Sequence, residues 1–439
     1  MMTEEFYIPE SREEKTFLIG ICHPHESMIS AEQTLRELHR LADTAGAKIG
    51  GEDLIRLREI HPGNFIGTGH AHAIASITEE LGADSVIFDE DLSPAQTRNL
   101  EEILEKKILD RTTLILDIFA QHAHSREGKL QVELAQLQYL LPRLRGRGAQ
   151  LSRLGGGIGT RGPGETKLET DRRRILKRIS RLKNDMAEIE KHRSNQRRRR
   201  LKKNVPAISL VGYTNAGKST LLKALTEADV LVEDQLFSTL DPTARKLILP
   251  GGRHAVLVDT VGFIRKLPHA LVASFKATLE EIKYSDLILM VADASSPTLK
   301  EELKASHEVL NLLELEHKNI FTLFNKIDLV EDRSLLAEVM EKNQPCEAVS
   351  AVEGTGLDAL LNRMARLLSK HRKFCRYRIP YHRFDLLAKL QAEGRNVKVD
   401  YRDDCIRVAC RLDSVNMERI EQDSDIIRLN KKPPEKERL

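Results

Sequence analysis

The sequence predicts a multidomain α/β protein in which one domain carries a phosphate-binding loop, and three observations support this fold class. The chain has 439 residues, of which 41% are hydrophobic, so it is long enough for about three domains and for at least one sizeable core. Two stretches alternate strand-like and helical patterns, which is typical of mostly parallel sheets. A buried-type strand, AISLV, runs directly into the loop GYTNAGKS and an apolar helix, the context that a P-loop requires.

The first domain, residues 1–127, is predicted to be a small α/β unit. Its predicted strands are Phe17–Cys22, Leu54–Ile60, Ser85–Phe88 and Thr113–Phe119, and its predicted helices include Ala31–Ala42 and Pro94–Glu105. The IGTG at Ile66–Gly69 resembles a phosphate loop, but Gly67 and Gly69 alone favour a plain turn.

Residues 128–204 are predicted to form a basic antiparallel helical hairpin. Apolar residues recur at steps of four and three in two series: Leu130, Leu134, Leu137, Leu141 and Leu144, then Ile175, Ile179, Leu182, Met186 and Ile189. Each series is a narrow seam that is most simply buried by pairing with the other. The connector Leu154–Glu165 is predicted to be non-helical because it is rich in glycine, and Thr166 and Glu169 are predicted to form a capping box for the second helix.

Charge is concentrated in this hairpin. Arg143–Lys203 contains 21 Lys or Arg and 6 Asp or Glu, a local net charge of +15, whereas the whole chain carries +3. The rest of the protein therefore carries −12 and is acidic. An imbalance of this size favours a polyanionic partner.

Residues 205–372 are predicted to form the P-loop domain. In the segment Gly212–Ser219, loop amides and the following helix N-terminus would surround phosphates. Lys218 would neutralise β- and γ-phosphate charge, and Ser219 would give an oxygen to Mg²⁺.

Three later segments predict that the nucleotide is GTP. Val256–Gly262 ends a strand with Asp259 for the magnesium shell and with a glycine whose amide can sense the γ-phosphate. Asn325–Asp328 follows another strand, and Ser350–Ala351 precedes a GTGL turn. The Asp328 carboxylate would accept hydrogen bonds from guanine, and adenine would leave buried groups unpaired.

The switch threonine is predicted to be Thr239, with Thr243 as the alternative. Phe263 follows Gly262, where Ras-like enzymes place a water-orienting Gln, so we expect slow intrinsic hydrolysis that is accelerated when a partner completes the site. The predicted catalytic residues are Lys218, Thr239 and Gly262, and the predicted metal ligands are Ser219, Thr239 and Asp259. The predicted nucleotide-binding residues are Gly212, Tyr213, Thr214, Asn215, Ala216, Gly217, Lys218, Ser219, Thr220, Phe237, Ser238, Thr239, Asp259, Thr260, Val261, Gly262, Asn325, Lys326, Asp328, Ser350, Ala351 and Val352.

Residues 373–439 are predicted to form a small α+β domain and a tail. The predicted strands are Arg376–Ile379, Val397–Tyr401 and Ile406–Leu412, with a helix over Phe384–Ala392. The final NKKPPEKERL has the composition of a disordered tail.

Several classes are disfavoured by the sequence. No run approaches the ~18 apolar residues of a membrane span, and the acidic N-terminus lacks the layout of a targeting segment. We therefore expect a cytoplasmic protein without integral membrane association, and we also expect it to be a monomer. Five scattered cysteines are expected to be reduced packing thiols rather than disulfides or zinc ligands; they are Cys22, Cys346, Cys375, Cys405 and Cys410.

The chain resembles the HflX-type GTPases of the Obg-related branch. The resemblance rests on the glycine-rich GGGIGTRGPGETKLETDRR (Gly155–Arg173), on REGKLQVELAQL (Arg126–Leu137), and on FSTLDPT and DTVGF. It extends over nearly the whole chain. Lys167 departs from a usual Gln, and His122 and His124 from common Arg residues, which bears on the detailed RNA contacts.

The resemblance implies a Mg²⁺-dependent, ribosome-associated GTPase that binds the large ribosomal subunit and its rRNA. It implies dissociation of stalled or idle ribosomes into subunits, with the N-terminal unit and the hairpin reaching toward the peptidyl-transferase region. Asn215 stands where potassium-stimulated GTPases carry an Asn, so the resemblance also implies K⁺ as a second cofactor.

The alternatives are an RNA-modification GTPase and a membrane-surface signalling GTPase with peripheral membrane association. The first would need a catalytic cysteine or cofactor fold. The second would need an apolar hairpin face, but the seam residues are already used in pairing. A His-x-His metal site at His122 and His124, or at His70 and His72, is less favoured than surface histidines, and ATP binding by the N-terminal unit stays open.

Overall fold

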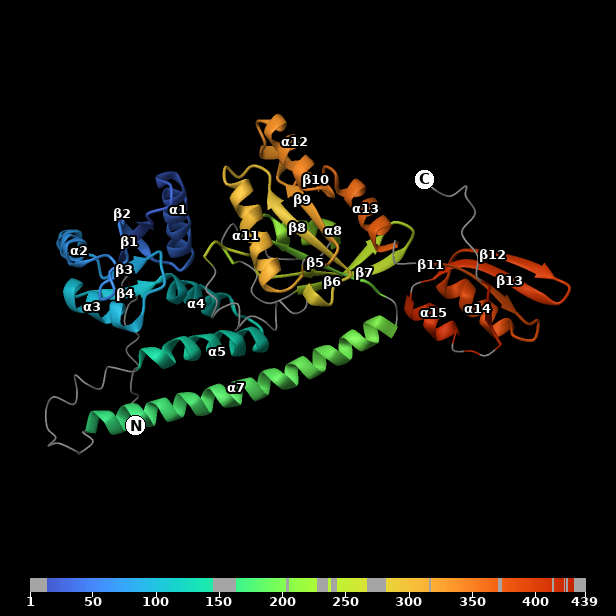
Figure 1. Ribbon diagram of the computed structural model, residues 1–439, viewed down its shortest axis with the longest axis horizontal. Helices are drawn as coiled ribbons and strands as arrows, with labels where there is room; N and C mark the ends of the chain where they lie inside the picture. Colours follow the sequence, from blue (N-terminus) through green and yellow to red (C-terminus); the bar gives the residue numbers. More distant parts are fainter. Residues whose placement is uncertain are drawn as a thin grey trace, which may run out of the picture.

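The computed structural model describes residues 14–144, 163–202, 205–226, 236–237, 243–266, 282–315, 317–369, 373–412, 414–421, 423 and 425–429. Its described strands form three sheets. Figure 1 shows the N-terminal sheet (blue) at one end, the central sheet in the middle and the C-terminal sheet (red) at the other end. The long helix α7, Pro163–Lys202, runs beneath the N-terminal and central parts.

The N-terminal sheet is parallel, with strand order β2-β1-β3-β4. Its strands are β1 (Lys15–Cys22), β2 (Lys48–Arg56), β3 (Ser85–Phe88) and β4 (Lys107–Asp110), and its helices are α1 (Met28–Thr44), α2 (Thr68–Glu80), α3 (Pro94–Leu104) and α4 (Arg111–His122). The strand predicted over Leu54–Ile60 therefore begins and ends earlier than expected. The IGTG turn leads into α2, and Gly67 has a φ of 78°, which glycine adopts without strain.

The predicted strand Thr113–Phe119 was wrong, because this segment is the middle of α4. Asp110 caps the helix by accepting a hydrogen bond from the Thr113 amide at 2.9 Å. Apolar residues are buried on nearly every side of α4. A helix that is buried all round has no polar face, so its apolar run cannot be distinguished from a buried strand by periodicity.

The antiparallel hairpin is confirmed by α7 and by α5 (Arg126–Arg143), which lie side by side in Figure 1. Leu134, Ile179 and Leu182 form the buried centre of the seam. Ion pairs between the helices join Arg178 to Glu133 at 2.6 Å and Arg193 to Glu127 at 2.8 Å. Leu130, Leu137, Leu141 and Ile175 pack against this centre, whereas Leu144, Met186 and Ile189 of the two predicted series do not belong to the cluster.

The start of α7 corrects the predicted capping box. The helix begins at Pro163, three residues before Thr166, so Thr166 is not its N-cap, and the end of the glycine-rich connector is helical. Proline is tolerated in a first helical turn because the amide it lacks has no partner there. Residues 154–162 of the connector lie outside the described residues.

The central sheet has the strand order β10-β9-β8-β5-β7-β6, and only β6 runs antiparallel. Its strands are β5 (Ala207–Gly212), β6 (Thr243–Leu249), β7 (Arg253–Asp259), β8 (Leu287–Asp293), β9 (Ile320–Asn325) and β10 (Cys346–Ala348). Its helices are α8 (Lys218–Thr226), α11 (Leu299–Leu312), α12 (Arg333–Lys342) and α13 (Leu357–Ser369). Two separate clusters, one with α8 and α13 and one with α11 and α12, pack on the sheet. This doubly wound arrangement brings the loops at the carboxyl ends of the parallel strands together.

The C-terminal sheet is antiparallel, with the order β12-β13-β11-β14. Its elements are β11 (Lys373–Ile379), α14 (Phe384–Glu393), β12 (Arg395–Arg402), β13 (Cys405–Leu412), α15 (Ser414–Glu421) and β14 (Ile427–Arg428). The predicted strands and helix are found, while α15 and β14 were not predicted. The predicted disordered tail, residues 430–439, lies outside the described residues.

None of the described helices is both long enough and apolar enough to cross a membrane.

Candidate nucleotide site

The P-loop follows β5 and turns sharply at glycines. Gly212 has a φ of 143°, and a Cβ there would lie 2.0 Å from the Val291 carbonyl oxygen of β8. Gly217 has a φ of 86°, and a Cβ there would lie 2.3 Å from Asn325 Nδ2. Both positions therefore require glycine, and the loop backbone lies close against two neighbouring strands.

Lys218 lies at the start of α8 and is 6% exposed. Its Nζ donates to the carbonyl oxygens of Gly212 at 3.2 Å and Tyr213 at 2.6 Å. Burial lowers its pKa to about 8, although the nearby Asp259 carboxylate acts in the opposite direction. The ammonium group is thus held inside the loop, where a phosphate would stabilise its charge.

Two oxygen groups that suit Mg²⁺ meet beside the loop. Ser219 Oγ donates to Asp259 Oδ2 at 2.8 Å, and Asp259 is 1% exposed at the end of β7. A hydroxyl and a carboxylate are ligands that Mg²⁺ accepts alongside phosphate oxygens and water. These two residues fit the predicted ion, but the third predicted ligand, Thr239, lies outside the described residues, as does Ser238.

The alternative switch threonine, Thr243, is described. It is the first residue of β6 and lies opposite Asp259 in the antiparallel register. The structure therefore places Thr243 in the strand next to the predicted magnesium ligand.

The segment after β7 is fixed to the P-loop by main-chain hydrogen bonds. The Phe263 amide donates to the Gly212 carbonyl at 2.9 Å, and the Thr214 amide donates to the Phe263 carbonyl at 2.8 Å. The Phe263 side chain is 1% exposed and belongs to the central core. Its ring is thus a packing group, consistent with the prediction that it does not orient water.

Gly262 sits where only glycine fits. A Cβ there would lie 2.7 Å from Thr214 Cγ2 and 3.1 Å from Lys218 Nζ. The Thr214 Oγ1 atom is buried and has no hydrogen-bond partner among the described residues. An orphaned buried hydroxyl between loop and strand is expected where a ligand supplies the missing partner.

The predicted base-binding segments are joined by Asn325. Its Nδ2 donates to the Ala216 carbonyl at 3.0 Å, and its Oδ1 accepts from the Ala351 amide at 3.0 Å. The Asn325 carboxamide therefore ties the P-loop to the Ser350–Ala351 loop. Asp328, two residues beyond Lys326, has an exposed side chain that is open to a ligand, whereas Ser350 is fully buried.

Asp293, which was not predicted from the sequence, lies beside the predicted base-binding segment. Its carboxylate pairs with Lys326 Nζ at 2.8 Å, and Lys326 has a left-handed backbone with φ 63°. The sequence could have indicated it, because Asp293 ends the apolar run LILMVAD, and the ends of parallel strands lie at the same sheet edge, which also carries Asn325.

Other predicted residues are placed as follows. Thr260 is fully buried and donates to the Leu210 carbonyl at 2.6 Å. Val261 belongs to a buried apolar cluster shared with the N-terminal unit. Asn215 has a φ of 59°, Thr220 is half-buried and Val352 is 79% exposed.

Phe237 packs against the N-terminal unit. Its ring meets Phe119 of α4 edge to face, with centroids 4.8 Å apart and an interplanar angle of 77°. Both rings are almost fully buried in the same cluster. The side chain of Phe237 thus contributes to an interdomain contact, and nucleotide binding at this position stays a prediction.

The N-terminal unit also reaches the P-loop directly. Tyr213 Oη donates to Glu37 of α1 and accepts from the Arg265 amide at 3.0 Å. Arg111 at the start of α4 donates to the Arg265 carbonyl at 3.0 Å. Both main-chain groups of Arg265, three residues after Gly262, are therefore held at this junction.

Buried charges make up the rest of the junction. Arg111 is 1% exposed and pairs with Glu37 and Asp89. Lys266 pairs with Glu90 and lies 3.5 Å from Asp89 Oδ2. Burial raises the pKa of Asp89 despite these cations. Removal of one partner from such a buried ion pair strongly destabilises the protein, because the other charge stays buried without a counter-charge.

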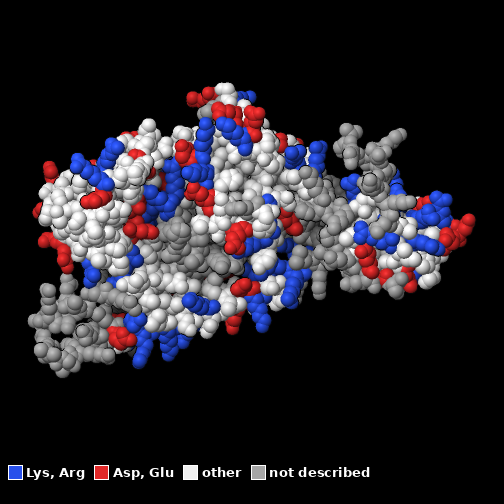
Figure 2. All heavy atoms as spheres, in the orientation of Figure 1, with Lys and Arg blue, Asp and Glu red and all other residues white. Residues whose placement is uncertain are grey.

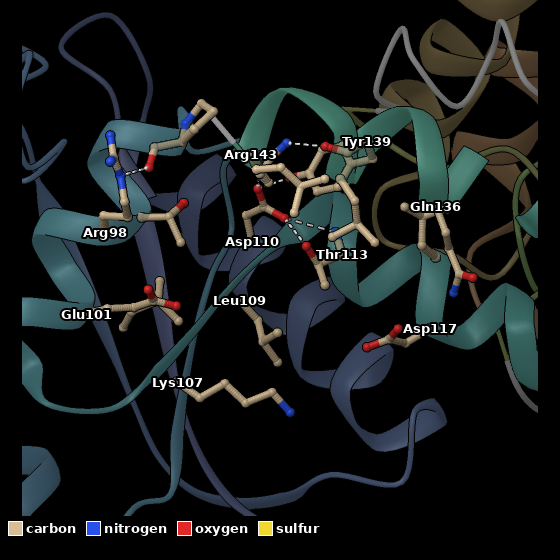
Figure 3. Close-up of a pocket in the computed structure, with 16 residues that line it drawn as sticks. Arg98, Glu101, Lys107, Leu109, Asp110, Thr113, Asp117, Gln136, Tyr139 and Arg143 are labelled. Carbon is tan, nitrogen blue, oxygen red and sulfur yellow. Dashed lines mark hydrogen bonds and ion pairs between the residues drawn. The ribbon is translucent and has the colours of Figure 1, made fainter. Parts of the chain in front are cut away.

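A cavity of about 500 Å³ lies in the N-terminal unit, bounded by α3, β4, α4 and α5 (Figure 3). Arg143 donates to Asp110 at 2.9 Å, and its guanidinium lies 3.4 Å from the centroid of the Tyr139 ring. Tyr139 also donates to Asp110. These polar groups satisfy one another, so they act mainly to fix α5 against the sheet.

In the described part of the chain, no group of three or more His, Cys, Asp or Glu side chains is arranged so that it could hold a metal ion, at the histidine pairs or elsewhere. His70 and His122 each make a hydrogen bond with a main-chain carbonyl, at 3.0 Å and 2.9 Å. All five cysteines are buried, and none of them forms a disulfide.

Three family models match the chain in succession. They are described as "GTP-binding GTPase N-terminal" (residues 32–120), "GTP-binding GTPase Middle Region" (122–200) and "50S ribosome-binding GTPase" (207–326). Together these ranges cover the N-terminal unit, the hairpin and most of the P-loop domain.

Curated relatives match over most of their length. A "GTPase HflX" from Caldanaerobacter subterraneus is 48% identical over 407 residues, 93% of each chain. A "GTPase HflX" from Escherichia coli is 46% identical over 338 residues, 77% of this chain and 79% of the relative. A solved GTP-binding protein from Sulfolobus solfataricus in complex with GDP is 27% identical with a TM-score of 0.43, covering 81% of this chain and 99% of that chain.

Proposed function

The chain belongs to the HflX family of GTPases, and from this premise we propose that it binds the large ribosomal subunit and separates stalled or idle ribosomes into subunits. Its enzymatic reaction is the hydrolysis of GTP to GDP and phosphate. The observation that carries the proposal is the basic hairpin joined to a nucleotide site. A cationic helix suits rRNA, and the P-loop domain supplies a nucleotide-dependent switch.

In this proposal, the site residues divide the work between phosphate, metal and base. Lys218 and the loop amides bind the phosphates, and Ser219, Asp259 and Thr239 would hold Mg²⁺, which would supply positive charge to the phosphates during hydrolysis. Asp328 and the Ser350–Ala351 loop recognise guanine. The Gly262 amide binds the γ-phosphate and so distinguishes GTP from GDP.

The junction supports a route from the nucleotide to the ribosome-binding parts. Arg265 follows Gly262 closely and is held by Arg111 and Tyr213. A shift of Gly262 on loss of the γ-phosphate therefore displaces Arg265 and changes its contacts with Arg111 and Tyr213. Because Arg111 begins α4 and α4 leads directly into α5, a movement of Arg111 also moves the hairpin.

The hairpin supports RNA binding by its charge and rigidity. Exposed cations on α7 include Arg173, Arg174, Lys177 and Arg181, while Leu182 and its partners form the seam. Figure 2 shows Lys and Arg along the lower edge of the molecule, where α7 runs in Figure 1. A rigid cationic rod of this kind can contact phosphates without rearranging.

Sedimentation of purified ribosomes through a sucrose gradient tests the proposal. With the protein and a non-hydrolysable GTP analogue, we expect the 70S peak to fall, free subunits to rise and the protein to travel with the large subunit. With GDP the 70S peak should persist. Sedimentation with anionic liposomes instead of ribosomes would support the membrane-surface alternative and contradict the proposal.

A further inference from the structure

The C-terminal sheet has one covered face and one open face. Its elements follow the order β-α-β-β-α-β, with the spatial order β12-β13-β11-β14, which is the split βαβ topology. The inner face packs on α14 and α15 around buried residues such as Tyr377, Val408 and Leu390. RNA-recognition modules use the other face of a four-stranded sheet of this kind to bind single strands.

The open face is rich in cations. Alternation along the strands places the following side chains on it: Phe374, Arg376 and Arg378 from β11, Arg407, Ala409 and Arg411 from β13, and Lys398, Asp400 and Arg402 from β12. The strand register sets Arg378 beside Arg407 and Phe374 beside Arg411. Six of these nine positions are Lys or Arg and one is Asp, so the face is a compact cationic surface.

Several acidic residues of this module pair away from the open face. Asp423 and Asp425 pair with Arg383, which precedes α14. Glu421 of α15 accepts from Tyr377. Figure 2 shows Lys and Arg gathered over the β12–β13 part of this module, with Asp and Glu at the hairpin tip and toward its helices. The module is therefore polarised despite its mixed composition.

Cations on the open face are available for exchange with phosphate. Arg378 pairs with Asp404 at 2.7 Å and Arg402 with Asp400 at 2.8 Å, and all four side chains are at least 45% exposed. Exposed pairs of this kind contribute little stability. Lys398 and Arg407 are also exposed, and phosphates can replace carboxylates without breaking the core.

One aromatic ring lies among the cations. Phe374 is half-buried, and the Arg376 guanidinium lies 5.5 Å from its centroid. A ring and a planar guanidinium are both groups on which a base stacks. With a single ring among six cations, phosphate contacts outweigh base contacts, and binding should show little sequence preference.

We propose that this open face binds single-stranded RNA through phosphate contacts. This site is separate from the hairpin surface of the proposed function and lies beyond residue 326, where the matched family models end. An acidic protein surface is the competing partner. RNA is favoured because it supplies both the regular phosphates for the cations and the bases for Phe374.

The test uses the full-length protein and a fluorescein-labelled single-stranded oligoribonucleotide of mixed sequence, with binding followed by anisotropy over a range of KCl concentrations. In the variant Lys398→Gln/Arg407→Gln, we expect the affinity to fall about tenfold and the slope of log K against log salt to shrink by about 1.4, because each lost phosphate contact removes about 0.7. The matched control Lys300→Gln/Lys304→Gln removes two exposed cations from α11 and should bind RNA as the wild type does.

Because the hairpin also attracts RNA, both pairs of substitutions are repeated in an Arg173→Gln/Arg174→Gln background, and crosslinked peptides are mapped with 4-thiouridine RNA. Crosslinks on β11 or β13 support the proposal. Unchanged affinity and slope of Lys398→Gln/Arg407→Gln in both backgrounds overturn it. Loss of ribosome binding by this variant in a separate sedimentation experiment, with RNA affinity unchanged, also overturns it and would indicate an acidic protein partner. Failure of subunit separation alone affects only the proposed function, since this assay contains no ribosomes.

Discussion

Lys218 illustrates how burial of one side chain controls the nucleotide site. Its pKa is lowered to about 8 because the ammonium group is desolvated in the P-loop. A bound phosphate favours the charged form and raises the pKa again. Nucleotide binding should therefore take up a proton when the pH approaches the pKa of the free protein.

We expect the affinity for GDP to fall as the pH rises from about 7 to about 9, because Lys218 then loses its proton in the nucleotide-free state. Calorimetry in two buffers of different ionisation enthalpy measures the affinity and the proton uptake together. A flat affinity with no proton uptake over this range would show that Lys218 stays charged without nucleotide.

The same shift predicts the pH dependence of stability. Since the folded pKa lies below the ordinary value of 10.5, the unfolded chain binds more protons between about pH 8 and about pH 10.5. The Lys218 contribution to the free energy of unfolding should therefore rise with pH in this window. Comparison of wild type with Lys218→Met, by urea unfolding without nucleotide, isolates it.

Asp328 is predicted to decide the choice of base. The change Asp328→Asn replaces a carboxylate acceptor with an amide that suits xanthine better, so GTP affinity should fall at least about 100-fold and XTP should be preferred. Glu331→Gln, a nearby exposed acid, is the matched control in a competition assay. An unchanged preference for GTP in Asp328→Asn would refute the guanine assignment.

Asn215 gives a prediction about monovalent cations. It lies in the exposed part of the P-loop with a φ of 59°, at the position implied to help hold K⁺ beside the phosphates. Hydrolysis should be faster in KCl than in NaCl at equal ionic strength. Identical rates, with and without ribosomes, would leave Asn215 as a residue that stabilises the loop.

At the scale of elements, the hairpin seam should control stability. Leu182 is fully buried and Leu176 is 42% exposed on the same helix. Leu182→Ala should destabilise the hairpin by about 2–5 kcal/mol through lost burial and a cavity, whereas Leu176→Ala should change it by less than about 0.5 kcal/mol. Far-UV circular dichroism during urea unfolding checks both, and equal effects would mean that the seam does not hold the hairpin.

Periodicity predicted the elements that have a polar face. The α5–α7 seam was predicted because polar residues recur between its apolar residues, and β13 because inward and outward residues alternate. By contrast, α4 was predicted as a strand because Leu114–Phe119 gives almost no polar contrast. The short β14 pairs only two residues with β11 and is too short for a periodic signal.

The parts of the candidate site that could be predicted are those formed by short contiguous motifs. Gly212, Lys218 and Asp259 lie in contiguous loops whose residue types are fixed by close packing and charge. The contact between Tyr213 and Glu37 could not be predicted, because the two residues lie 176 positions apart in the sequence and in separate domains. Such contacts depend on how the domains dock, which no local pattern specifies.

At the scale of the whole molecule, the junction should couple the nucleotide to the N-terminal unit. Glu37→Gln weakens the pairing with Arg111 and Tyr213, so the Arg265 segment should be held less firmly. We expect a change in the ratio of GTP to GDP affinity together with faster amide exchange in α4 and at Arg265. Glu32→Gln, an exposed acid on the same helix, is the control. Unchanged affinities and exchange in Glu37→Gln would show that the junction is only structural.

Ribosome binding by the hairpin and hydrolysis by the P-loop domain should be separable. The most direct measurement compares the wild type with Arg172→Glu/Arg173→Glu/Arg174→Glu, recording GTP hydrolysis with and without ribosomes and the subunit profile on a sucrose gradient. We expect nearly unchanged basal hydrolysis in the variant, with ribosome stimulation and subunit separation lost. A variant that still separates ribosomes as well as the wild type would contradict this division of labour and assign the separation to another part of the molecule.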